Sequence, residues 1–105
     1  MCGRYALYDI SKSKLNIDIE LIPNYNVCPS SKILIINNKK EIRIVYWALK
    51  SPWSDKVQII NARSETIDAK NIFKYTERCI FIANGYFEWK KESSKKVPYY
   101  HYFSK

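Results

Sequence analysis

Short apolar runs separated by polar turns make up most of the chain, and several of them alternate between apolar and polar residues. The runs 32–37 (KILIIN) and 41–47 (EIRIVYW) flank the polar stretch 37–40, a spacing that predicts a β-hairpin. Residues 23–26 and 49–56 contain proline among polar residues and are expected to be loops. Further strands are expected at 4–8, 57–60, 79–83, 86–91 and 97–103.

Helical spacing is limited to two segments. Apolar residues at Ile67, Ile72 and Phe73, with a capping residue at Ser64 or Thr66, predict a helix over 64–75. Residues 11–21 fit either a short helix or a strand, and we favour the helix. The pattern therefore predicts an α+β fold that is mostly β, with a curved antiparallel sheet or incomplete barrel, one or two short helices, and a single domain over 1–105.

Composition narrows the function classes. The net charge is +8 and 15% of the 105 residues are aromatic, which suits nucleic acid but equally fits a lysine-rich surface kept for solubility. Three widely spaced cysteines and one histidine resemble neither a disulfide framework nor a zinc site, so we expect a reducing, cytoplasmic compartment and no metal or other cofactor. Without a long apolar run, no membrane partner is expected.

The first residues hold the most distinctive chemistry. Cys2 becomes the N-terminus once Met1 is removed, and its α-amine and thiol then form a 1,2-aminothiol. An amine adds to an aldehyde to give a Schiff base, and the neighbouring thiol can close on it as a thiazolidine. Both groups are partly nucleophilic near neutral pH, since their ordinary pKa values are about 8 and 8.5.

Three polar residues occupy unusual places further along the chain. Asn61 and Arg63 follow an apolar strand, and Glu88 lies within the aromatic run 85–89. Each also has an ordinary explanation: Asn61 as a strand terminator, Arg63 as an ion-pair partner of Glu65 or Asp68, and Glu88 on a solvated strand face.

Seven motifs occur in order along the chain: MCGRY at 1–5, YNVCP at 25–29, residues 47–53 with a tryptophan at each end, NARSET at 61–66, RCI at 78–80, GYFEW at 85–89 and PYY at 98–100. Together they resemble the SOS-response-associated peptidase (SRAP) family. The resemblance extends over nearly the whole chain, to about residue 102.

This resemblance implies a protein that crosslinks itself to abasic sites in single-stranded DNA. Cys2 would capture the ring-opened deoxyribose aldehyde, Asn61 would orient the amine or the sugar, and Glu88 would move protons. Arg4 and Arg63 would hold the flanking phosphates. The implied partner is single-stranded DNA, and the implied place is the nucleoid. Tryptophans that would stack on bases are Trp53 and Trp89, with Trp47 the weakest candidate because at least one is expected in the core.

The chain also departs from the family pattern. It resembles only the N-terminal half of the domain and lacks the family's catalytic histidine, so we expect either a complementary chain that supplies the other half or a monomer. Ala48 stands where the family usually has glycine, and Asn84 stands where it usually has aspartate. Of the other cysteines, Cys79 is expected in the core and Cys28 to be structural.

Three alternatives remain open at this point. The chain could be a peptidase that releases Met1, a non-catalytic module that binds single-stranded nucleic acid reversibly, or an inactive truncated remnant. The retained Cys2, Asn61 and Glu88 favour the covalent function.

Overall fold

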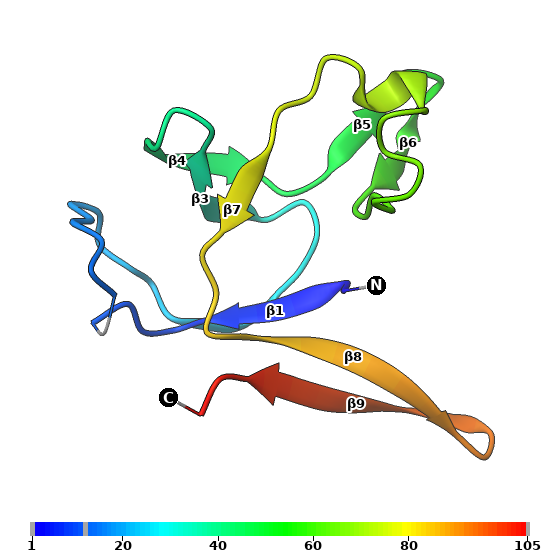
Figure 1. Ribbon diagram of the computed structural model, residues 1–105. Helices are drawn as coiled ribbons and strands as arrows, with labels where there is room; N and C mark the ends of the chain where they lie inside the picture. The colour runs from blue at the N-terminus through cyan, green and yellow to red at the C-terminus, as the bar shows by residue number, and fades with distance from the viewer. Residues whose placement is uncertain (1, 12, 105) are drawn as a thin grey trace. The chain divides into compact units, whose positions relative to one another are not determined.

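The computed structural model describes residues 2–11 and 13–104, which form nine short strands and one turn of 3-10 helix (Figure 1). The chain divides into two compact units: unit 1 consists of Met1–Cys28 with Ile82–Lys105, and unit 2 is Pro29–Phe81. The elements are β1 (Arg4–Leu7), β2 (Asn24–Val27), β3 (Lys32–Asn37), β4 (Ile42–Tyr46), β5 (Leu49–Ser51), β6 (Ser54–Ile59), η1 (Asn71–Phe73), β7 (Cys79–Phe81), β8 (Gly85–Glu92) and β9 (Lys95–Tyr102).

Unit 1 contains one four-stranded antiparallel sheet, in the order β2-β1-β8-β9. Its central strand β1 is almost fully buried because both of its edges are paired and it carries the apolar run YAL. In Figure 1, β8 and β9 form a long hairpin that extends beyond β1. The buried side chains of this unit are those of Tyr5, Ala6, Leu7 and Val27.

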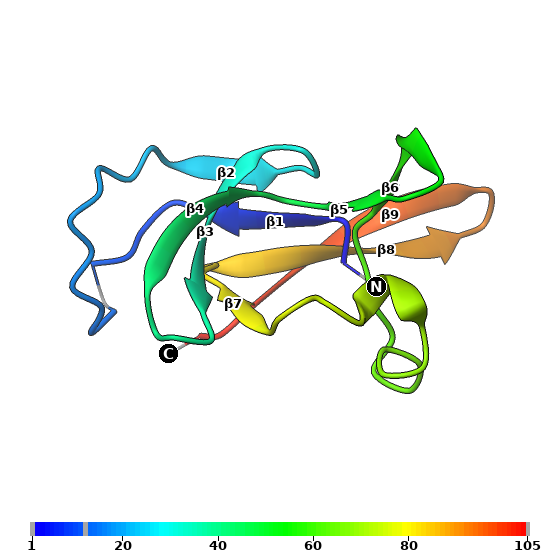
Figure 2. The same cartoon turned by 90° about the horizontal axis from the view of Figure 1, so that it is seen from above.

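Unit 2 contains a three-stranded sheet, β4-β3-β7, and a separate hairpin, β5-β6. The predicted hairpin at 32–47 is confirmed as β3 and β4, paired in a regular antiparallel register. Figure 2 shows the long connection from β6 to β7, which carries η1. The buried apolar side chains of this unit are those of Ile33, Leu34, Ile35 and Trp47.

The mostly-β, antiparallel class is confirmed, and the sheets in the described residues do not close into a barrel, in agreement with the prediction. The helix expected over 64–75 is wrong: turns form there instead, and η1 is a single 3-10 turn whose preceding residue, Lys70, offers no side-chain cap. A short helix without a long apolar stripe is marginal in water, so isolated turns replace it. The described residues of 11–21 contain no helix either.

Two segments predicted as loops are strands. β2 pairs with β1 from the edge of the sheet, and three of its four residues are exposed, so no apolar run marked it. β5 was missed because it is only three residues long and carries one apolar residue, Leu49, too few for an alternating pattern. The expectation that Cys79 is buried is also wrong, because β7 is an edge strand whose residues are exposed.

Candidate functional site

Cys2 lies directly before β1 and is half-buried. Its thiol donates a hydrogen bond to the backbone carbonyl of Arg4, with 3.0 Å between Sγ and O. This contact folds the N-terminal residues back on the start of the strand at the bend around Gly3. The Cys2 side chain therefore has a defined local position.

Tyr5 is the neighbour of Cys2 that the sequence did not single out. Only 4% of its surface is exposed. Burial, and to a lesser extent the charge of the Cys2 thiolate, raise the pKa of the Tyr5 phenol to about 12. The phenol therefore stays protonated at neutral pH, close enough to Cys2 for the two groups to interact electrostatically.

Arg4 is held from the side by the neighbouring strand. Its guanidinium Nη1 donates a hydrogen bond to Oδ1 of Asn26 on β2, at 3.1 Å. The half-buried arginine keeps further N–H donors in its planar fork, and that geometry suits phosphate oxygens. Asn26 thus restricts the orientation of a side chain that is a candidate for DNA binding.

Glu88 lies in the middle of β8, opposite Tyr99 of β9, and is half-buried. By strand alternation it shares a face with Tyr86 and Lys90, which are both exposed. Two residues away, Tyr86 stacks on His101, with ring centroids 5.0 Å apart. Trp89 points to the opposite face by strand alternation and is 46% exposed, as a base-stacking residue requires.

Asn61 follows β6 in unit 2 and is half-buried. It lines an open, mainly apolar concavity of about 330 Å³ that lies wholly within this unit. Trp47 lines the same concavity but is only 5% exposed and packs edge-to-face against Phe81. Trp47 is therefore a core residue, in agreement with its place as the weakest stacking candidate.

Arg63 and Trp53 are the exposed candidates of unit 2. Trp53 lies in the β5–β6 turn with 81% of its surface exposed, and its backbone N–H donates to Oγ of Ser51 at 3.2 Å. In the described part of the chain, Arg63 forms no ion pair with Glu65 or Asp68. Both side chains are thus accessible to a ligand.

The candidate residues are divided between the two units. Unit 1 holds Cys2, Arg4, Glu88 and Trp89, and unit 2 holds Asn61, Arg63 and Trp53. Within unit 1, the pairing of β1 with β8 sets Arg4 opposite Phe87, so that the N-terminal residues and Glu88 lie on adjacent strands. This pairing joins residues 79 to 83 positions apart in the sequence.

The family assignment rests on the length of the match. The sequence profile of the SOS response associated peptidase (SRAP) family matches residues 1–105. The chain belongs to the SRAP family.

Several curated proteins are similar to this SRAP chain. The abasic site processing protein YedK of Escherichia coli is 36% identical over 97% of the chain and 54% of its own length. YoaM of Bacillus subtilis, described in the same words, is 40% identical over 93% of the chain and 52% of its own length. The abasic site processing protein HMCES of Xenopus tropicalis is 26% identical over 77% of the chain and 31% of its own length.

The chain therefore spans about half the length of the bacterial relatives it matches. No solved structure matches it significantly. The described residues contain no helix long and apolar enough to cross a membrane. Among the same residues, no group of three or more histidine, cysteine or acidic side chains could hold a metal ion.

Three residues of this SRAP site carried no clear sequence signal: Tyr5, Asn26 and Asn84. Tyr5 and Asn26 lie within quoted motifs, but only the fold shows that they contact or approach Cys2 and Arg4. Asn84 precedes Gly85, and the sequence marks it only as a residue that stands where the family usually has aspartate. Its hydrogen bonds to residues near position 9 depend on long-range pairing that local patterns do not encode.

Proposed function

We propose that this chain is a DNA damage-response protein that captures abasic sites in single-stranded DNA covalently through Cys2. The observation that carries the proposal is an N-terminal cysteine anchored at the start of β1, in a chain of the SRAP family whose curated relatives are named abasic site processing proteins. DNA in the cytoplasmic nucleoid is the proposed place of action.

The chemistry needs no external oxidant or reductant. After Met1 is removed, the α-amine of Cys2 attacks C1′ of the ring-opened deoxyribose and forms a carbinolamine. Loss of one water gives the Schiff base. The thiol sulfur then adds to the imine carbon while a proton moves to the imine nitrogen, which closes a thiazolidine. The only net by-product is the water.

Glu88 is the proposed proton carrier for these steps. A carboxylate can accept a proton from the amine during attack and return one to the departing hydroxyl. Asn61 is the proposed hydrogen-bonding partner of the amine or the sugar, since an amide offers both a donor and an acceptor. Neutralising Glu88 as Glu88→Gln should slow crosslinking by about 10²–10⁴-fold if it performs this proton transfer.

Binding of the DNA strand is assigned to two kinds of side chain. Arg4 and Arg63 are proposed to hold phosphates beside the lesion, and the exposed Trp53 and Trp89 to stack on bases. The net charge of +8 favours the approach of a polyanion. Binding before the covalent step should therefore weaken steeply as salt is raised.

The deciding experiment mixes the Met-processed chain with single-stranded DNA that carries one abasic site and separates the products on a denaturing gel. A shifted band is expected, and Cys2→Ser should abolish it. The matched controls are Cys28→Ser and Cys79→Ser, which remove the other two thiols and should leave the band unchanged. DNA with a tetrahydrofuran site, which has no aldehyde, should give no band.

A band that persists in Cys2→Ser would overturn the chemistry. If the chain binds DNA only reversibly, with equal affinity for intact and abasic strands, the non-catalytic module is the correct function. If crosslinking appears only after addition of a polypeptide equivalent to the second half of the relatives, a complementary chain is a required partner.

A further inference from the structure

Asn84 connects the two strands that carry the candidate catalytic residues of unit 1. We propose that Asn84 is a positioning residue, which fixes the register of β1 against β8 and so the place of Cys2 relative to Glu88. The role of Cys2 and Glu88 in this statement rests on the proposed function, whereas the contacts of Asn84 do not.

The amide of Asn84 uses both of its ends. Its Oδ1 accepts hydrogen bonds from the backbone N–H groups of Tyr8 at 2.8 Å and Asp9 at 3.0 Å. Its Nδ2 donates to the backbone carbonyl of Asp9 at 2.8 Å. The backbone N–H of Asn84 donates to the carbonyl of Ala6, also at 2.8 Å. Four hydrogen bonds therefore join one residue to the end of β1.

The pairing that these bonds extend is short. Arg4, Tyr5 and Ala6 pair with Phe87, Tyr86 and Gly85, which is only three positions. Such a short ladder gives little resistance to a shift of one strand along the other. A shift by one residue would also turn every side chain of a strand to the opposite face.

The register matters for the chemistry because of where the reactive groups lie. Cys2 precedes Arg4 by two residues, and Glu88 follows Phe87 by one. Any slip between the strands therefore moves Cys2 along β8 and changes its distance from Glu88. Proton transfer requires positioned groups, and a misplacement of about 1 Å can cost on the order of 100-fold in rate.

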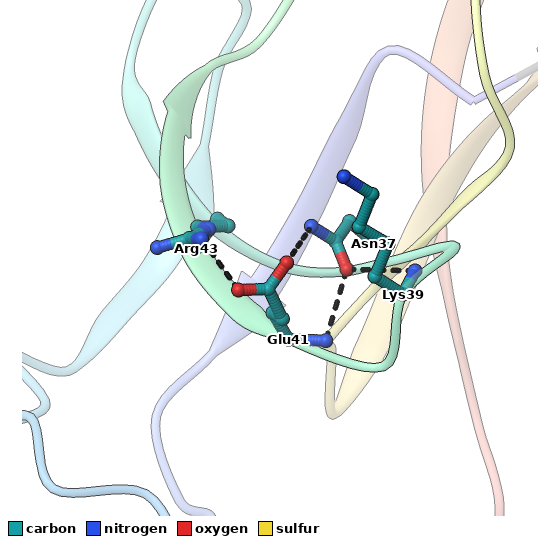
Figure 3. Close-up of polar contacts among 4 residues, drawn as sticks. All are labelled: Asn37, Lys39, Glu41 and Arg43. Atoms are coloured by element: carbon teal, nitrogen blue, oxygen red, sulfur yellow. Dashed lines mark hydrogen bonds and ion pairs between the residues drawn. The ribbon is translucent and has the colours of Figure 1, made fainter.

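Asn37 provides a matched comparison, since its amide makes the same kinds of bonds in unit 2 (Figure 3). Its Oδ1 accepts from the backbone N–H groups of Lys39 and Glu41, and its Nδ2 donates to the Glu41 carboxylate. These partners lie two and four residues away, so Asn37 shapes one local turn. The partners of Asn84 lie 75 and 76 residues away. A residue that only forms a local turn would not bond to such distant residues.

The test compares three variants in the crosslinking reaction. For each variant the rate is measured over a range of DNA concentrations. This gives the rate at saturating DNA and, separately, the DNA concentration at which half of that rate is reached. Asn84→Ala removes all three side-chain hydrogen bonds and should lower the saturating rate about tenfold or more. Asn84→Asp keeps an oxygen for the N–H groups of Tyr8 and Asp9 but loses the donor to the Asp9 carbonyl, so its saturating rate should lie between those of Asn84→Ala and the wild type. Asn37→Ala should leave the saturating rate unchanged.

Amide hydrogen exchange supplies a readout that needs no DNA. In Asn84→Ala, exchange at the N–H groups of Tyr8 and Asp9 should accelerate, whereas Asn84→Asp should keep them protected. If Asn84→Ala does not fold, Asn84→Ser takes its place, since a single hydroxyl cannot accept from both N–H groups and also donate to the Asp9 carbonyl.

Equal crosslinking rates for Asn84→Ala and Asn37→Ala would overturn the positioning role. Unchanged exchange at the N–H groups of Tyr8 and Asp9 in Asn84→Ala would show that the Asn84 side chain does not hold the end of β1. If the wild type does not crosslink, the proposed function fails on its own. The exchange measurement still confirms or rejects the role of Asn84 in fixing the register of β1 against β8.

Discussion

The two units of the chain are built in different ways. Unit 2 is one continuous segment, and its largest pairing is the local hairpin β3–β4. Unit 1 joins the two ends of the chain, because β1, which also pairs with β2, pairs with β8 from the distant half of the sequence. Local pairing limits the loop entropy that must be lost, whereas long-range pairing needs side-chain contacts that compensate for it.

The candidate residues are distributed differently between the two units. The candidate nucleophile Cys2 lies in unit 1. In this unit Asn84 bonds to the end of β1, Asn26 bonds to Arg4, and the buried Tyr5 interacts electrostatically with Cys2. Unit 2 contributes exposed or half-exposed side chains on turns and strand ends, such as Trp53 and Asn61. We therefore expect a small change at a buried position to lower the stability more in unit 1 than in unit 2.

The largest effect is expected at Gly85, where a β-carbon would lie 2.6 Å from the carbonyl oxygen of His101 and closer still to the ring of Tyr100. Gly85→Ala should destabilise the chain by about 3 kcal/mol, because a backbone atom cannot move away as a flexible side chain can. Urea unfolding followed by tryptophan fluorescence measures the loss.

The double variant Gly85→Ala with Tyr100→Ala separates the steric clash with the Tyr100 ring from the clash with the His101 carbonyl. It removes the ring but keeps the carbonyl of His101, so it should not recover the stability of Tyr100→Ala alone. If Gly85→Ala unfolds at the same urea concentration as the wild type, β8 and β9 are not paired as the structure has them.

The sequence predicted the fold best where pairing is local and apolar. The runs at 32–37 and 41–47 identified β3 and β4, and the aromatic runs identified β8 and β9, since alternation is a property of neighbouring residues. The edge strand β2 was missed because it is mostly exposed. The order β2-β1-β8-β9 could not be predicted, because no local pattern encodes which distant strands pair.

The candidate site shows the same limit. Cys2 and Glu88 stand out by residue type and by family motif, whereas Asn84 has an ordinary turn sequence. Its importance depends on the two N–H groups that it meets 75 and 76 residues earlier in the chain. Residues that act directly can be found from sequence motifs, but residues that position them are found only in the folded chain.

The second prediction concerns alkaline pH. The two tyrosines whose pKa values are raised to about 12, Tyr5 and Tyr100, both lie in unit 1, and burial is the main cause in each. Between about pH 10 and pH 12 these phenols ionise in the unfolded chain but not in the folded one, so stability should be complete below pH 10 and fall over that range. Urea unfolding at pH 9, 10, 11 and 12 measures the decline.

Tyr5→Phe is the matched variant, because it removes the ionising group but keeps the ring. The decline in stability above pH 10 should be shallower in this variant than in the wild type. Hydrogen exchange should show the loss first in unit 1, and equal loss of protection in unit 2 would contradict the difference between the units.

A smaller effect, of opposite sign, is expected in unit 2. Ala48 has a φ of 135°, a conformation that favours glycine and costs other residues about 1–3 kcal/mol. Ala48→Gly should therefore stabilise the chain by about 1 kcal/mol, after allowance for the greater freedom of glycine in the unfolded state. The midpoint of urea unfolding should rise, and a fall would show that the methyl group of Ala48 contributes more by packing than its backbone loses by strain.

The smallest effect is expected from the corresponding change in unit 1, in the turn between β8 and β9. Ser93 has a φ of 55°, close to the left-handed minimum, which a polar residue adopts at lower cost than the 135° of Ala48. Ser93→Gly should change the unfolding free energy by no more than about 0.5 kcal/mol, because relief of this milder strain is nearly cancelled by the entropy of glycine in the unfolded chain. Urea midpoints of the two glycine variants, measured side by side, test the ranking. A larger gain from Ser93→Gly than from Ala48→Gly would mean that the strain lies in the hairpin of unit 1 and not in unit 2.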